Sequence, residues 1–108
     1  MARYSCVYHL SGSAKRVREI LVGVFDSDRF VQIHDSPAYW VMREQPGRVP
    51  FDQLVTIEFL LDVPPEGDRF QLTCIAKNDA LTLQRDNHCR HVFDGVESIV
   101  KQIATSPT

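Results

Sequence analysis

Two neighbouring stretches alternate between apolar and polar residues, and this alternation restricts the fold more than any other feature of the chain. In 54–63 every second residue is apolar from Val55 onward, and Glu58 and Asp62 lie on the opposite side. The stretch 69–77 repeats the pattern after a proline- and glycine-containing turn. A period of two is typical of a strand with one buried face. These stretches therefore predict an antiparallel hairpin with one apolar and one solvated face.

The same criterion predicts further strands at 2–10, 29–34, 38–43 and, as a short piece, 80–85. In 2–10 one face is expected to point inward, and three of its four side chains carry a polar tip: Tyr4, Cys6, Tyr8 and Leu10. In 29–34, His34 is expected on the face of Phe30. In 38–43, Trp40 and Tyr39 lie on opposite faces, and both faces are apolar. This strand is either covered on both sides or presents an aromatic patch.

Helical spacing predicts two helices. The first spans about 13–25, is capped by Ser11 or Ser13, and has a stripe made of Ala14, Val17, Ile20, Leu21 and Val24. The second starts at Asp86, ends near Ala104, and has a broad stripe made of Cys89, Val92, Phe93, Val96, Ile99, Val100 and Ile103. Gly95 is expected near the buried side, where it would let the helix approach the sheet closely.

The chain has 108 residues, which suits one domain over 1–108 with a frayed tail at 105–108. The order of elements, β-α-β-β-β-β-α, predicts a two-layer α+β domain with both helices on one face of a curved antiparallel sheet. This order resembles that of TATA-binding-protein-like domains and of small helix-grip domains. The first resemblance implies an open sheet face for nucleic acid or protein. The second implies a small apolar ligand between the sheet and the last helix.

Composition restricts the class of partner and the compartment. The net charge is −2 and the pI is near 6.0, whereas nucleic-acid binders usually carry a basic excess. Nucleic acid is therefore an unlikely partner, with only Lys15, Arg16 and Arg18 as candidate contacts. Three separated cysteines predict free thiols in a reducing cytoplasm. Since no apolar run approaches the ~20 residues of a membrane span, no membrane association is predicted.

Reactive side chains gather in the first turn of the final helix, at His88, Cys89 and His91. A thiol there would feel the positive end of the helix dipole, which lowers its pKa, and a histidine could act as its base. Cys89 also belongs to the apolar stripe, however, and a buried thiol is inert. The two histidines alone are too few ligands for zinc. No catalytic residue, metal site or cofactor is predicted.

The sequence thus favours a non-catalytic binding or adaptor domain that contacts another protein or a second copy of itself. The contact would use a sheet face, a strand edge or the region of Tyr39 and Trp40. The alternative is a pocket for a small apolar ligand between sheet and last helix. Tyr4 and Tyr8 would line that pocket, with His88 and His91 at its mouth. If such a pocket also carried out catalysis, the protein would be a thiol-dependent enzyme. The sequence therefore leaves the question of enzymatic activity open.

Overall fold

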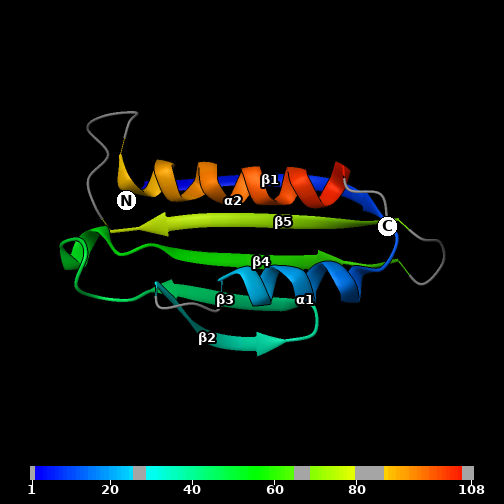
Figure 1. Ribbon diagram of the computed structural model, residues 1–108, viewed down its shortest axis with the longest axis horizontal. Helices are drawn as coiled ribbons and strands as arrows, with labels where there is room; N and C mark the ends of the chain where they lie inside the picture. Colours follow the sequence, from blue (N-terminus) through cyan, green and yellow to red (C-terminus); the bar gives the residue numbers. More distant parts are fainter. Residues whose placement is uncertain (1, 26–28, 65–68, 80–86, 106–108) are drawn as a thin grey trace.

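The computed structural model of the chain describes residues 2–25, 29–64, 69–79 and 87–105. The predicted order of elements is confirmed (Figure 1): β1 (Ala2–Ser11), α1 (Ala14–Phe25), β2 (Phe30–Ser36), β3 (Tyr39–Glu44), the short 3-10 helix η1 (Phe51–Gln53), β4 (Thr56–Asp62), β5 (Arg69–Asn78) and α2 (His88–Thr105). The predicted short strand at 80–85 and the tail at 106–108 lie outside the described residues.

All five strands form one antiparallel sheet in the order β1-β5-β4-β3-β2. The hairpin predicted from 54–77 is its centre, where Phe59 lies opposite Cys74. The first strand returns to pair with the last, from Ala2 opposite Asn78 to Ser11 opposite Arg69. The sheet is therefore open, with β1 at one edge and β2 at the other.

Both helices cover the same face of the sheet, as predicted (Figure 1). Helix α2 packs on β1 and β5. Helix α1 covers the other half, where Phe25 meets the rings of Phe30 and Phe59 at centroid distances of 5.7 Å. The buried side chains of both halves join in a single hydrophobic cluster. Among the described residues, neither helix combines the length and the apolar character required to cross a lipid bilayer.

The helix ends and stripes differ in part from expectation. Ser13 caps α1, because its Oγ accepts a hydrogen bond from the amide of Arg16 at 3.1 Å. Asn87 caps α2, because its Oδ1 accepts from the amide of Arg90 at 2.9 Å. The predicted cap, Asp86, lies outside the described residues. The buried stripe of α1 is Val17, Leu21 and Phe25, whereas Ile20 and Val24 of the predicted stripe are exposed.

Two local predictions are wrong. The register of β2 shifts between Gln32 and His34, so that His34 lies opposite Val41 and on the other face from Phe30. One extra residue in a strand reverses the alternation beyond it, and the sequence gives no signal for such a bulge. Gly95 is exposed, and a Cβ built there meets no atom within 4 Å. It therefore permits no close approach of α2 to the sheet.

Candidate functional site

Because both helices cover one face of the sheet, the other face carries side chains that no described element covers (Figure 1). We call this surface the open face. Antiparallel register arranges its side chains in rows that cross the strands. One row begins at Arg3 and ends at Val31, and the next begins at Ser5 and ends at His34. Side chains far apart in sequence thereby become neighbours.

The row nearest the η1 end of the sheet is cationic. Arg3 lies opposite Lys77, Lys77 opposite Thr56, and Thr56 opposite Arg43. The ammonium group of Lys77 lies 3.2 Å from Oε2 of Glu58 in the adjacent row. Arg43 is exposed and has no ion-pair partner within the described part of the chain. We call Arg3, Lys77, Thr56 and Arg43 the cationic row.

Beside the cationic row, the centre of the open face is apolar. Val7 is 52% exposed and Leu60 is 38% exposed, and one residue of β5 separates them in the row. Ile75 is half-buried beside them, and Val41 is buried. Exposed apolar side chains that adjoin one another mark an interaction surface more often than isolated ones do.

Glu58 anchors the polar contacts of the open face. Its Oε1 accepts a hydrogen bond from the hydroxyl of Tyr39 at 2.6 Å. Partial burial acts to raise the pKa of Glu58, but the hydrogen bonds from Tyr39 and Lys77 and the charges of Lys77 and Arg3 outweigh it, so that the pKa lies below its usual value. The same hydrogen bond raises the pKa of Tyr39. Glu58 is thus an ionised carboxylate with a partner at each oxygen, and Arg43 is a cation of the open face that it does not engage.

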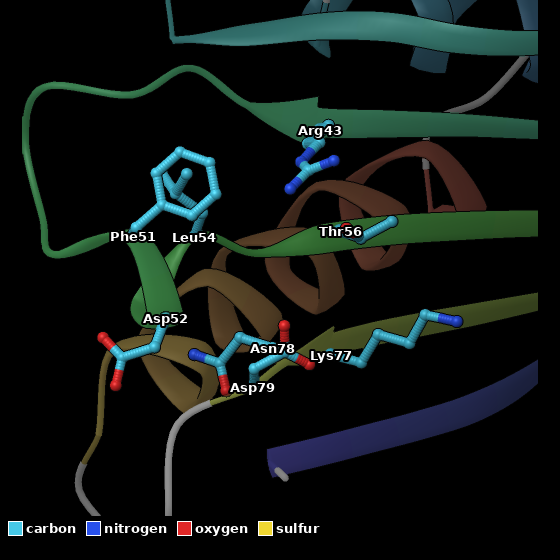
Figure 2. A pocket seen from close by; sticks show the side chains of 8 residues that line it. All are labelled: Arg43, Phe51, Asp52, Leu54, Thr56, Lys77, Asn78 and Asp79. Atoms are coloured by element: carbon cyan, nitrogen blue, oxygen red, sulfur yellow. The ribbon is translucent and has the colours of Figure 1, made fainter.

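At its η1 end the open face deepens into a cavity of about 490 Å³ (Figure 2). Arg43 and Lys77 project on either side of Thr56, and Asp52 and Asp79 lie at the opposite end of the cavity. Two further residues form its apolar part, the buried Leu54 and Phe51, whose side chain is 73% exposed at the rim. The cavity therefore offers a cationic end, an anionic end and an aromatic edge.

Asn78 lines this cavity and carries a buried side-chain oxygen. The residue is 6% exposed, and its Nδ2 donates to the carbonyl of Gln53 at 3.2 Å. Its Oδ1 is buried and has no donor among the described residues. Buried polar atoms are rarely left without a partner in folded proteins, so this oxygen is an exception within the described part of the chain.

The tyrosines predicted as site residues lie on different faces. Tyr4 and Tyr8 are half-buried between β1 and α2. Tyr4 stacks on Phe93 with a centroid distance of 5.8 Å, and its hydroxyl accepts from Nδ2 of Asn87 at 2.8 Å. The hydroxyl of Tyr8 donates to Oε2 of Glu97 at 3.3 Å. Both hydroxyls thus tie the first strand to the last helix. Of the predicted six, only Tyr39 lies on the open face.

The other predicted site residues are Trp40, His88 and His91. Trp40 is fully buried under α1 and stacks on Phe59 with a centroid distance of 5.2 Å. His91 is exposed on α2. His88 is half-buried, and its Nε2 lies 2.8 and 3.0 Å from the two carboxylate oxygens of Glu44. The structure does not bring these three residues together with the tyrosines in one site.

Burial governs the chemistry of the three thiols. Cys89 is fully buried, and desolvation, with the charge of Glu44, raises its pKa to about 11. Burial also raises the pKa of Cys74 and of Cys6, which lie opposite each other on β5 and β1. A thiolate is the reactive form, so these shifts favour inert thiols. In the described part of the chain no three His, Cys, Asp or Glu side chains are grouped as metal ligands would be.

Sequence reasoning missed the residues that define the cavity. Arg43 and Asn78 each stand at the end of a predicted strand, and Phe51 stands in a proline-containing loop. The alternation placed Lys77 on the solvated side of its strand, whereas Arg43 ended a strand for which both faces were expected to be apolar. It did not show that they share a row, because strand order and register are tertiary properties. An aromatic side chain in a polar loop was the one signal that pointed to Phe51.

Comparisons with known proteins add no relative: no protein-family model matches the chain, and neither the curated proteins nor the solved structures yield a match.

Proposed function

We propose that this domain is a non-catalytic binding module that docks an acidic segment of a partner protein on its open face. The observation that carries the proposal is the cationic row beside the exposed apolar side chains of Val7 and Leu60. A segment that alternates acidic and apolar residues would match both features, since an extended chain presents its side chains with a period of two. Three free thiols support a reducing, cytoplasmic setting.

Charge favours a different, acidic protein over a second copy of this chain. On its strands the open face carries four basic side chains, Arg3, Arg43, Arg69 and Lys77, against two acidic ones, Glu58 and Asp62. Two further acidic side chains, Asp52 and Asp79, lie in its cavity at the end away from Arg43. The whole chain, in contrast, has a net charge of −2. Two copies docked through this face would bring like charges together, which is unfavourable. An acidic segment would gain attraction from the same charges.

Arg43 is the residue to which we assign the main electrostatic contact. It lies at the cationic end of the cavity and has no ion-pair partner in the described part of the chain. A guanidinium group holds a carboxylate with two parallel hydrogen bonds, which gives orientation as well as energy. The exposed ring of Phe51 lies at the rim of the same cavity and offers an apolar contact to the neighbouring partner residue.

The thiol-dependent enzyme has no support from the environment of Cys89. Its thiol is buried and its pKa is raised, whereas a nucleophilic cysteine needs a lowered pKa and access to a substrate. Tyr4 and Tyr8 were expected to line a ligand pocket, but their side chains contact α2 directly. Tyr4 contacts Asn87 and Phe93, and Tyr8 contacts Glu97.

The test uses a fluorescently labelled peptide of alternating glutamate and leucine, with an alternating lysine and leucine peptide as the charge-reversed probe. We expect the acidic peptide to bind, measured by anisotropy, and to shift the amide signals of β3, β4 and β5. Arg43→Glu and Leu60→Asp should each weaken binding about tenfold or more, equivalent to about 1.4 kcal/mol. Arg16→Glu makes the same charge change on exposed α1 and serves as the matched control.

Several results would contradict this proposal. One is equal binding of the two peptides, and another is an unchanged affinity in Arg43→Glu. A dimer that Leu60→Asp dissociates would identify a second copy as the occupant instead. Tight binding of a single-stranded oligonucleotide at the same residues, with steep loss of affinity as salt increases, would replace the protein partner with nucleic acid.

A further inference from the structure

A second cavity lies on the helical side of the molecule, far from the cationic row in the fold. It has a volume of about 550 Å³ and lies between the first turns of α1, the turn from β2 to β3 and the end of β4. Its walls are mainly apolar and include Ala14, Pro37, Ala38, Leu61 and Val63. Pockets for small organic ligands have volumes of about 300–1,000 Å³ and similar walls.

Arg18 brings a positive charge to this apolar cavity. Its guanidinium group lies over the ring of Trp40, 5.3 Å from the centroid, and also forms an ion pair with Asp35. The Nε of Arg18 is buried and has no hydrogen-bond acceptor among the described residues. The ion pair with Asp35 therefore leaves part of the hydrogen-bonding capacity of this side chain unused, because a guanidinium has five N–H donors.

Two more buried donors without an acceptor lie in the same part of the fold. They are Nε1 of the fully buried Trp40 and Nε2 of Gln32. Trp40 lies opposite Asp35 in the sheet, and Gln32 lies opposite Met42, two residues further along β3. A buried donor that lacks an acceptor is unfavourable, because it has lost its hydrogen bonds to water. Of these three donors, only that of Arg18 belongs to a residue that lines the cavity, so the guanidinium group of Arg18 is the one that can meet an acceptor there.

We propose that this cavity binds a small organic acid, a carboxylate with a short apolar body. The carboxylate accepts hydrogen bonds from Arg18, and the apolar body lies against Ala38 and Leu61. Lys15 at the rim adds a second positive charge. With Asp35 as the acidic residue of the lining, the cavity has a net positive charge that favours an anion over a neutral ligand of the same shape. This site is independent of the open face and of the function proposed for it.

The chain supplies its own reporter for this site. Trp40 is its one tryptophan and lies directly beneath Arg18. We expect hexanoate to change Trp40 fluorescence with a saturable titration curve. Acetate lacks the apolar body and 1-hexanol lacks the charge, so we expect the affinity of each to be lower by about tenfold or more, equivalent to about 1.4 kcal/mol.

Variants assign the response to the cavity. Arg18→Gln should weaken hexanoate binding about tenfold or more, and Ala38→Leu should fill the cavity and abolish binding while the ion pair of Arg18 and Asp35 stays intact. Arg16 is exposed and does not line the cavity, so the Arg16→Gln variant should bind hexanoate as tightly as the unaltered protein does. Circular dichroism verifies folding of each variant, and Ala38→Leu remains decisive if Arg18→Gln unfolds.

The proposal is overturned if hexanoate gives no saturable response up to its solubility limit. Equal affinity for hexanoate and 1-hexanol would overturn the role of the charge, and equal affinity for acetate would overturn the apolar body. Unchanged binding in a folded Ala38→Leu variant would place any hexanoate site elsewhere.

Discussion

At the scale of single residues, Glu44 stands out because it is the charged side chain that is buried among the described residues. It is 1% exposed, and its carboxylate accepts hydrogen bonds from Nε2 of His88 and from the amide of Val55 at 3.2 Å. Arg29 lies 3.5 Å from its Oε2. A buried carboxylate is tolerated only when such partners replace water. The contact between Glu44 and His88 therefore joins the end of β3 to the first turn of α2, and it gives His88 a structural role.

We expect His88→Ala to lower the free energy of unfolding by about 1.5–3 kcal/mol, the range for hydrogen bonds to charged groups. The loss follows because Glu44 would stay buried with fewer donors. Urea denaturation monitored by Trp40 fluorescence measures the change.

His9→Ala is the matched control for this prediction, because His9 is exposed and should change the stability by no more than about 0.5 kcal/mol. A loss for His88→Ala as small as that of the control would show that the contact with Glu44 does not support the fold.

Sequence reasoning reached His88 but not its partner. His88 was a candidate site residue because Cys89 and His91 are close to it in sequence. In the structure Cys89 is buried and His91 is exposed, so neither shares the surroundings of His88. Glu44 follows Trp40 and Met42 at the inward positions of β3, so the alternation itself placed a carboxylate in the core. The two residues are 44 positions apart, and only the packing of α2 against the end of the sheet brings them together.

At the scale of elements, periodicity was sufficient to locate the five strands and the two α-helices to within a few residues, but it did not indicate η1. Periodicity did not predict which face of the sheet His34 lies on. The sequence pattern of β2 alternates regularly, whereas the strand contains a bulge that shifts its register between Gln32 and His34. Periodicity also predicted wrongly that Gly95 lies near the buried side of α2, because its apolar neighbours recur at helical spacing. In the structure Gly95 is exposed and contacts no other element.

We expect Gly95→Ala to raise the free energy of unfolding by about 0.5–1 kcal/mol, because alanine loses less backbone entropy in a helix and its methyl group meets no atom within 4 Å. A shift of the urea midpoint measures it.

Gly47→Ala is the contrasting substitution, since Gly47 has φ of +121° and alanine there should lower stability by about 1–2 kcal/mol. Destabilisation by Gly95→Ala would mean that α2 lies closer to another element than described.

At the scale of the whole molecule, the order β1-β5-β4-β3-β2 separates a protected centre from two edges. Strands β4 and β5 each have two neighbours, and their inward side chains from Ile57 to Ala76 are buried. Strand β2 has one neighbour, a bulge and the exposed side chains of Val31 and Ile33. Local opening should therefore be easiest at β2.

Native-state hydrogen exchange tests this difference. We expect the amides of β4 and β5 to exchange about tenfold or more slowly than those of β2, equivalent to about 1.4 kcal/mol of additional opening free energy. The amides of β3 that bond to β4 serve as the internal reference. Equal protection of β2 and β5 would show that the sheet opens only as one unit.

The pairing of the first strand with the last one has a consequence for how the chain reaches this structure. Strands β2, β3 and β4 each pair with the next strand in sequence, so these contacts close short loops. Strand β1 pairs only with β5, and Ala2 meets Asn78 across most of the chain. Contacts of such long sequence separation carry a larger entropic cost of closure and slow folding. During synthesis β1 emerges before β5, so its hydrogen-bonding edge stays without its partner until Arg69–Asn78 has been made, and it can mispair in that interval.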